Sequence, residues 1–484
     1  MTMQTRSTGQ GTYRAGAAGA VVAGYTETPP APPRVEAPRV IAWRAHRLLE
    51  APILPTVARL AAPGLVLALF QTASSIADTH FVGRLGTDAL AGLALVFPLL
   101  MLLQMTSAGA MGGGVSAAVA RALGAGNEAA ARNLVAQALA IGLAAGLTFT
   151  LLMLALGPAL YALLGGSGAA LAQALVYSNV LFASAVLVWL ANTLASVLRG
   201  SGNTLVPALA LAGVVLVQIP LSGALTLGRG PFPPLGIAGA ALAYGIAFGI
   251  ASFGMAAYLW SSALWPRGAD WRLAWRPLRD ILRVGAVSSV AALQTVLTAV
   301  ILTGFVGGFG TAALAGYGVG VRLELLQVPI VFAIGQALVV LVGTHLGAGR
   351  LARAKQIAWT GTALAMAVSG AIALCVALRP TAWVGIFSGD PAVLEAGSLY
   401  LRIVAPCYPL FAGGMALYFA SQGAGRVLLP MLSGTARFAI VVAGGILVVK
   451  LAAPLGALFA VIAGGLTLLG ALTGLAVYKT AWAR

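Results

Sequence analysis

Hydrophobic and polar positions along the chain alternate in long blocks, in which mostly apolar runs are separated by short segments rich in charge, Gly and Pro. An apolar run of about 20 residues has the length of a helix that crosses a lipid bilayer. This pattern predicts an all-α membrane protein with twelve spanning helices, six in each half. They are expected at residues 55–80, 90–115, 131–157, 170–198, 204–227, 235–260, 280–305, 313–342, 356–378, 393–419, 427–449 and 454–478.

Composition supports a protein that is solvated by lipid. Hydrophobic residues make up 60% of the chain and charged residues only 8%, whereas a soluble domain carries about 25% charged residues. The net charge of +17 does not indicate a nucleic-acid-binding protein, because the basic residues are dispersed between apolar segments instead of covering one soluble face. Residues 1–50 are rich in Pro and Arg and lack an apolar run, which predicts a disordered tail and not a signal peptide.

The basic residues also predict the orientation of the chain, because Lys and Arg concentrate in cytoplasmic loops. Of the 28 Lys and Arg residues, three fall inside predicted spans and four lie on one side, which leaves 21 on the side that includes the tail. Both termini are therefore expected to be cytoplasmic.

An internal repeat divides the chain into two similar halves. Residues 81–92 reappear as residues 305–316, at an offset of 224, and residues 123–126 reappear as residues 346–349, at an offset of 223. Six spans per half is an even number, so both halves enter the membrane from the same side and are related by an axis along the membrane normal. The expected domains are a cytoplasmic tail at 1–50, an N-lobe at 51–262, a cytoplasmic linker at 263–279 and a C-lobe at 280–484.

Four motifs resemble those of the multidrug and toxic compound extrusion (MATE) family. They lie at residues 77–86, 124–127, 198–204 and 322–349, and the resemblance covers nearly all of residues 55–480. The last motif is most similar to the bacterial DNA-damage-inducible-protein-F-like branch. The resemblance implies two pseudo-symmetric six-helix lobes in a V-shape, which export cationic amphiphiles in exchange for H⁺ or Na⁺.

Two acidic residues, Asp78 and Glu324, fall clearly inside predicted spans. A carboxylate is costly in a bilayer, so both are candidates for function. Protonation, or the binding of a cation, would neutralise a charge that otherwise holds a cationic substrate. The resemblance makes Asp78 the cation-coupling carboxylate, although an interfacial capping role stays open. Pro63 matches the helix-1 proline of the family, and we hypothesise that protonation of Asp78 changes a bend there.

The expected partners of Asp78 lie on the fifth predicted helix. Gln218 and Ser222 are one turn apart and share a helix face. They occupy positions where related proteins often carry an Asn and an Asp, so this chain lacks the second carboxylate of a tight Na⁺ site. This departure favours H⁺ as the coupling ion. Asn192 and Tyr244 are further candidate neighbours.

Glu324 has two open interpretations. It either contacts substrate or ion in a central cleft, or pairs with Arg402 or Arg437, which are unusual charges in apolar runs. These arginines are expected to snorkel or to pair structurally, and one that faced the cleft would disfavour cationic substrates. Gln294 is a further candidate for the cleft.

Together these features predict a secondary active antiporter that exports amphipathic, cationic organic compounds or drugs in exchange for H⁺ by alternating access, with Na⁺ as the less favoured ion. The alternative is a flippase for lipids or lipid-linked precursors. No constellation of catalytic or metal-binding residues is found, so we expect no enzyme, no metal and no cofactor. The protein is expected to be a multi-pass monomer in the bacterial inner membrane.

Overall fold

The computed structural model describes residues 48–480 and residue 482, and every regular element among them is helical. Most of the predicted tail, residues 1–47, therefore lies outside the described residues. The first half consists of α2 (Ile53–Gly83), α3 (Thr87–Gln104), a π-helix (Met105–Met111), α4 (Gly112–Gly124), α5 (Glu128–Leu163), α6 (Gly168–Ala183), α7 (Ala185–Gly200), α8 (Leu205–Leu227) and α9 (Ile237–Trp260). The second half consists of α10 (Trp275–Gly307), α11 (Thr311–Gly347), α12 (Leu351–Leu378), α13 (Pro380–Val384), α14 (Pro391–Val404), α15 (Tyr408–Ala424), α16 (Leu428–Lys450) and α17 (Leu455–Lys479).

The described helices account for all twelve predicted spans. Eleven are long and apolar enough to cross a membrane, and a twelfth is complete if α6 and α7 form one span, bent by 47°. The predicted helix 90–115 continues to Gly124 through the π-helix. The predicted helix 280–305 begins earlier, at Trp275, because arginines in its first turns can extend toward the membrane surface while the helix continues. The fold class predicted from the sequence is confirmed.

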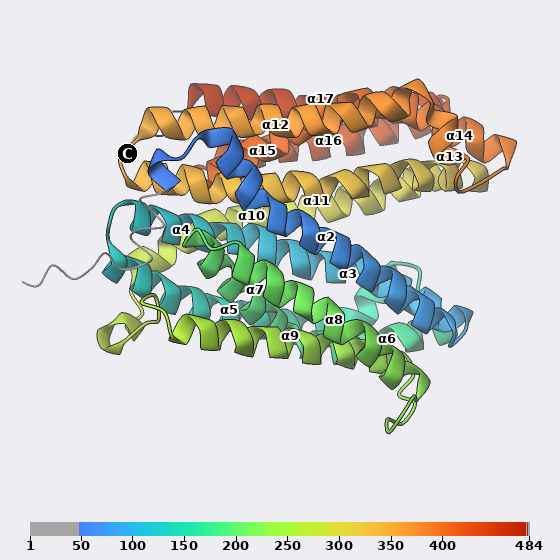
Figure 1. Cartoon of the computed structure of the whole chain (residues 1–484). Coiled ribbons are helices and arrows are strands. Elements are labelled where there is room, and N and C mark those ends of the chain that lie inside the picture. The colour runs from blue at the N-terminus through green and yellow to red at the C-terminus, as the bar shows by residue number, and fades with distance from the viewer. Residues whose placement is uncertain (1–47, 481, 483–484) are drawn as a thin grey trace, which may run out of the picture. The chain divides into compact units, whose positions relative to one another are not determined.

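The helices run antiparallel, so that the start of α2 and the end of α17 lie at the same end of the bundle, on the left in Figure 1. We call this the basic end, defined by the turns at residues 125–127, 201–204, 348–350 and 425–427. The opposite end carries the turns at residues 84–86, 228–236, 308–310 and 451–454. An even number of passes explains why both ends of the described chain meet at one end.

Each half has a hydrophobic core of its own, but α2 and α10 contribute to both. The first turns of α2, with Val57, pack against α11 and α12 of the second half, whereas Val82, near its end, belongs to the core of the first half. Figure 1 shows α2 crossing diagonally between the two groups of helices. The reverse holds for α10, where Ile281 packs into the first core and Leu302 into the second. Two helices thus connect the lobes at equivalent places.

The two lobes are in tight contact at the basic end. A Cβ atom at Gly124, the last residue of α4, would lie 2.1 Å from the carbonyl oxygen of Thr344 in α11. A Cβ atom at Gly347 would lie 2.1 Å from the carbonyl oxygen of Arg121. Such separations are possible only without side chains. Among the described helices, α11 packs extensively against α4, which ends at the basic end, so the lobes are closed there.

Candidate transport site

The carboxylate of Asp78 accepts two hydrogen bonds from α8. Gln218 Nε2 donates to Oδ2 at 2.6 Å, and Ser222 Oγ donates to Oδ1 at 2.8 Å. Both donors are buried, and because they are four residues apart they project from the same face of α8. The structure therefore brings together the three residues that the sequence predicts as one site.

A close helix contact next to this site explains how Asp78 reaches α8. The ring of Phe81 packs against Gly223, where an added Cβ atom would lie 2.9 Å from Phe81 Cζ. The repeat reproduces this contact in the second half, because Phe305 packs against Gly445 in the same way. At the repeat position of Asp78, however, the second half carries Leu302. The scaffold is symmetric, and the carboxylate is present in only one copy.

Asn192 and Tyr244 join a second polar network and do not bond to Asp78. Asn192 Nδ2 donates to Ser107 Oγ at 2.8 Å and to Gln104 Oε1 at 3.2 Å, and Gln104 Nε2 donates to the hydroxyl of Tyr244. Gln104 is the last residue of α3 and Ser107 lies in the π-helix that follows, a feature that often marks functional sites. Neither residue was predicted from the sequence, although a lone amide in an apolar run is a signal that points to Gln104.

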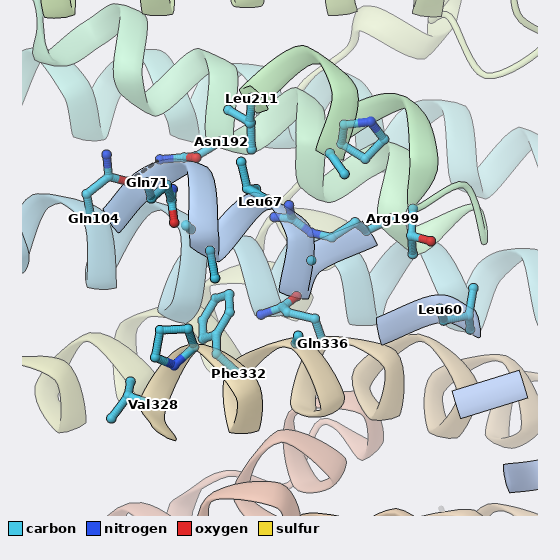
Figure 2. A pocket seen from close by; sticks show the side chains of 18 residues that line it. Leu60, Leu67, Gln71, Gln104, Asn192, Arg199, Leu211, Val328, Phe332 and Gln336 are labelled. Atoms are coloured by element: carbon cyan, nitrogen blue, oxygen red, sulfur yellow. Dashed lines mark hydrogen bonds between the residues drawn. The ribbon is translucent and has the colours of Figure 1, made fainter. Parts of the chain in front are cut away.

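A cavity of about 220 Å³ lies between the two lobes. Figure 2 shows Gln336 and Phe332 of α11 on one side of it and Asn192, Leu211 and Arg199 of α7 and α8 on the other. Along α2 the cavity is lined by Leu60, Gly64, Leu67, Ala68 and Gln71. Of the residues predicted for the cleft, Asn192 lines this cavity.

Glu324 and Gln294 lie away from the cavity, inside the second lobe. The hydroxyl of Tyr400 donates to Glu324 Oε2 at 3.3 Å. Gln294 Nε2 donates to Thr435 Oγ1 at 2.9 Å, which ties α10 to α16. Neither residue is among those that line the cavity, so the structure gives no support to the expectation that they contact a substrate there.

In the described part of the chain no intramembrane arginine forms a direct ion pair with Glu324, but the charges of Glu324 and Arg437 interact electrostatically. The guanidinium of Arg437 lies over the ring of Phe411, with Cζ 5.5 Å from the ring centroid. Arg322 lies over Phe387 at 5.0 Å in the same manner, and Arg402 is exposed. Stacking on an aromatic face stabilises a cation, and for Arg437 the negative charge of Glu324 adds to this without a direct ion pair.

The two halves of the chain match one known family. The sequence profile of the family MatE matches residues 63–223 and again residues 288–447. The chain belongs to the MatE family. The two matched segments confirm the internal repeat, and membership confirms the resemblance noted from the sequence. This MatE chain is accordingly a multi-pass membrane transporter that binds small-molecule substrates, and it is not an enzyme.

Individual relatives extend over most of the MatE chain. A protein named "FAD transporter" from Shewanella oneidensis is 30% identical over 374 residues, which are 75% of this chain and 80% of the relative. "Probable multidrug resistance protein NorM" from Deinococcus radiodurans is 33% identical over 470 residues, which are 89% and 98% of the two chains. A solved MOP superfamily transporter from Pyrococcus furiosus superposes with a TM-score of 0.82 at 23% identity and covers 90% of this chain and 98% of its own. That likeness shows the shared fold.

Proposed function

We propose that this MatE chain is a secondary active antiporter that exports amphipathic organic molecules in exchange for protons. The observation that carries the proposal is the carboxylate of Asp78, which is held by Gln218 and Ser222 inside a spanning helix. A carboxylate inside a bilayer is energetically costly, so its presence indicates a functional role. Names of relatives, which include multidrug resistance proteins and an FAD transporter, support export of small organic molecules.

Helix α2 connects the Asp78 site to the cavity. Gln71 lines the cavity, and Asp78 follows seven residues later on the same helix face, about 10 Å along the axis. A change in how Asp78 is held can therefore be transmitted along one rigid helix to the wall of the cavity.

Pro63 provides a place where α2 can bend. Proline removes one backbone hydrogen bond of a helix and so permits a kink. It precedes Gly64, where an added Cβ atom would lie 3.2 Å from Cβ of Ala333 in α11, at the crossing from the second core to the first. A bend at Pro63 would move the half of α2 that carries Asp78 relative to the second lobe.

Proton binding supplies the driving force in this scheme. The ionised carboxylate accepts both hydrogen bonds from α8, and protonation weakens it as an acceptor. We propose that α2 then separates from α8 and changes the cavity, so that substrate leaves as the proton enters. In this proposal Asp78 binds the proton with different affinity in the two lobe states. Proton binding therefore shifts the equilibrium between these states, which links proton flux to lobe exchange.

The composition of the site favours H⁺ over Na⁺. The oxygen ligands grouped at Asp78 are its two carboxylate oxygens and Ser222 Oγ, while Gln218 presents an N–H donor to the carboxylate. Hard cations are held by sets of several oxygen ligands. A proton needs only one carboxylate oxygen.

The basic end is proposed to face the cytoplasm of a bacterium, with the chain acting as a monomer in the inner membrane. This orientation follows the excess of Lys and Arg on the side of the tail. The proposed lobes, N-lobe 51–262 and C-lobe 280–484, then open alternately to the two sides of the membrane.

The test uses purified protein in liposomes, with proton and sodium gradients imposed separately. Ethidium and flavin mononucleotide serve as a cationic and an anionic probe. We expect the proton gradient to drive transport of at least one probe and Asp78→Asn to abolish it. Asp88→Asn is the matched control, because Asp88 is an exposed acid at the start of α3. Full activity of Asp78→Asn, or transport driven by sodium alone, would contradict the proposal.

A further inference from the structure

The cavity between the lobes contains one ionisable side chain, and it is basic. Among the residues that line it, Arg199 is charged, and the remaining polar members are the amides Gln71, Gln104, Asn192 and Gln336 and the hydroxyl of Thr204. No carboxylate lines the cavity in the described part of the chain. The electrostatic character of the cavity is thus opposite to that expected for a site that holds cations.

The guanidinium of Arg199 has unused hydrogen-bonding capacity. A guanidinium carries five N–H donors. Among the described residues, Arg199 donates through Nη2 to Ser196 Oγ at 2.8 Å, and its buried Nε has no partner. A charge withdrawn from water without a counter-ion is costly, and a bound anion would remove that cost. Arginine also suits phosphate and carboxylate groups, because it can present two parallel N–H donors to them.

No other titratable group competes for Arg199 from the helices that surround the cavity. The lining positions of α2, α3, α8 and α11 are apolar or uncharged. The two intramembrane carboxylates are engaged elsewhere, Asp78 with α8 and Glu324 with Tyr400. An anionic group that enters the cavity would therefore meet one unopposed positive charge.

The opposite wall offers a polar and an apolar contact. Gln336 is buried, and both polar atoms of its amide lack a partner among the described residues. One turn earlier, Phe332 presents an aromatic ring, and Leu67 and Leu211 add apolar surface. In Figure 2 the side chains of Gln336 and Phe332 rise from α11 toward α2, while Arg199 extends from the opposite side. A flat apolar body with polar substituents fits such a wall.

We propose that the cavity recognises an amphipathic organic anion, whose phosphate, sulfonate or carboxylate group binds Arg199 while its apolar body packs against Phe332. This proposal rests on the transporter function proposed above and replaces the cationic substrate that the sequence predicted. The anionic group can belong to a soluble molecule or to the head group of a lipid, since both offer the same oxygen acceptors to Arg199.

Equilibrium binding to the purified full chain in phosphatidylcholine nanodiscs tests the proposal with two pairs of matched probes. Flavin mononucleotide and riboflavin share one ring system and differ by a phosphate. Fluorescein and rhodamine 123 share a xanthene body and differ in the sign of their charge. We expect the anionic member to bind more tightly in at least one pair, by about tenfold or more, the effect of one hydrogen-bonded charge.

Substitutions at Arg199 assign that preference to the cavity. Arg199→Gln should remove the preference for the anion, and Arg199→Lys, which keeps the charge but not the planar fork, should retain part of it. Arg322→Gln is the matched control, because Arg322 is exposed and stacked on Phe387, and it should bind like the unmodified chain. Monodisperse elution and an unchanged melting temperature confirm that each variant is folded.

The outcomes separate this proposal from the antiport mechanism. No preference for the anion in either pair, or a preference that persists in Arg199→Gln, would overturn the anionic site. Because binding needs no gradient, such results leave proton-driven transport to be judged by Asp78→Asn alone.

Repeating the titration in phosphatidylglycerol nanodiscs identifies the source of the anion. Loss of flavin mononucleotide binding there assigns the site to a lipid head group, and unchanged binding assigns it to a soluble anion.

Discussion

Gly124 and Gly347 occupy equivalent positions of the internal repeat, and each packs directly against the backbone of the helix that carries the other. An added Cβ atom would lie 2.1 Å from Thr344 O at Gly124 and 2.1 Å from Arg121 O at Gly347. Arg121 Nη1 also donates to the carbonyl oxygen of Gly423 at 2.9 Å, again from one lobe to the other. The repeated motif thus forms the contact that closes the basic end.

Replacing either glycine by alanine should open the basic end. A methyl group has no room at 2.1 Å from a carbonyl oxygen, and forced overpacking costs about 1–3 kcal/mol. Since 1.4 kcal/mol is a tenfold change in an equilibrium, Gly124→Ala and Gly347→Ala should each lower the population of the closed state about tenfold. Distances between spin labels in the turns at residues 125–127 and 425–427 measure that population.

A third glycine provides the control for this prediction. Gly213 is in the middle of α8, and an added Cβ atom would meet nothing within 4 Å. Gly213→Ala should therefore leave the label distances unchanged. If Gly124→Ala gave the same distances as Gly213→Ala, the glycine contact would not control closure.

Much of this architecture could be predicted from the sequence because spanning helices are long and apolar, and because the repeat is visible as offset motifs. The contact between Gly124 and Gly347 could not be predicted. A repeat states that two segments are alike, but it does not state that they touch. Likewise, α2 and α10 each contribute to both cores through tertiary packing. A domain boundary placed in the linker between the two halves does not reveal this.

The candidate site was predicted only in part, for reasons that lie in individual residues. Asp78 stands out because an acid inside an apolar run is rare, and Gln218 and Ser222 follow from their spacing of one turn. Arg199 did not stand out, because it lies beside a turn and resembles an ordinary loop charge. Gln336 is one of two amides in the long apolar helix α11, and only its position relative to α2 places it in the cavity.

Pro63→Ala should slow the transport cycle without weakening substrate binding. The alanine restores the backbone hydrogen bond to the carbonyl of Arg59, four residues earlier, and so favours a continuous helix where α2 passes between the cores. Turnover in liposomes should fall about tenfold or more, given a change of at least 1.4 kcal/mol in the cost of bending. Pro158→Ala in α5 is the control, because that proline is also inside a helix but faces outward. Equal turnover of the two variants would exclude a hinge at Pro63.

Gln104→Leu should destabilise the protein more than Gln71→Leu does. Both amides line the cavity, but only Gln104 bonds to Asn192 and Tyr244. Replacing Gln104 removes a hydrogen-bond partner of both buried groups. Losing such a bond costs about 1 kcal/mol of stability in membrane proteins. Gln71 is exposed to the cavity and makes no side-chain hydrogen bond among the described residues. Thermal unfolding in detergent should show a lower melting temperature for Gln104→Leu alone, and equal melting temperatures would mean that the network adds no stability.

Glu324→Gln should retain proton-driven transport, in contrast to Asp78→Asn. Glu324 accepts a hydrogen bond from Tyr400 within the second lobe, and the carbonyl oxygen of a glutamine can accept the same bond. Because Glu324 neither lines the cavity nor contacts α2 through a hydrogen bond, loss of its charge should change the transport rate by less than about twofold, within the effect of one neutral hydrogen bond. Rates for both variants are measured in the same liposomes under the same proton gradient. A Glu324→Gln variant as inactive as Asp78→Asn would mean that two carboxylates, and not Asp78 alone, couple proton entry to export.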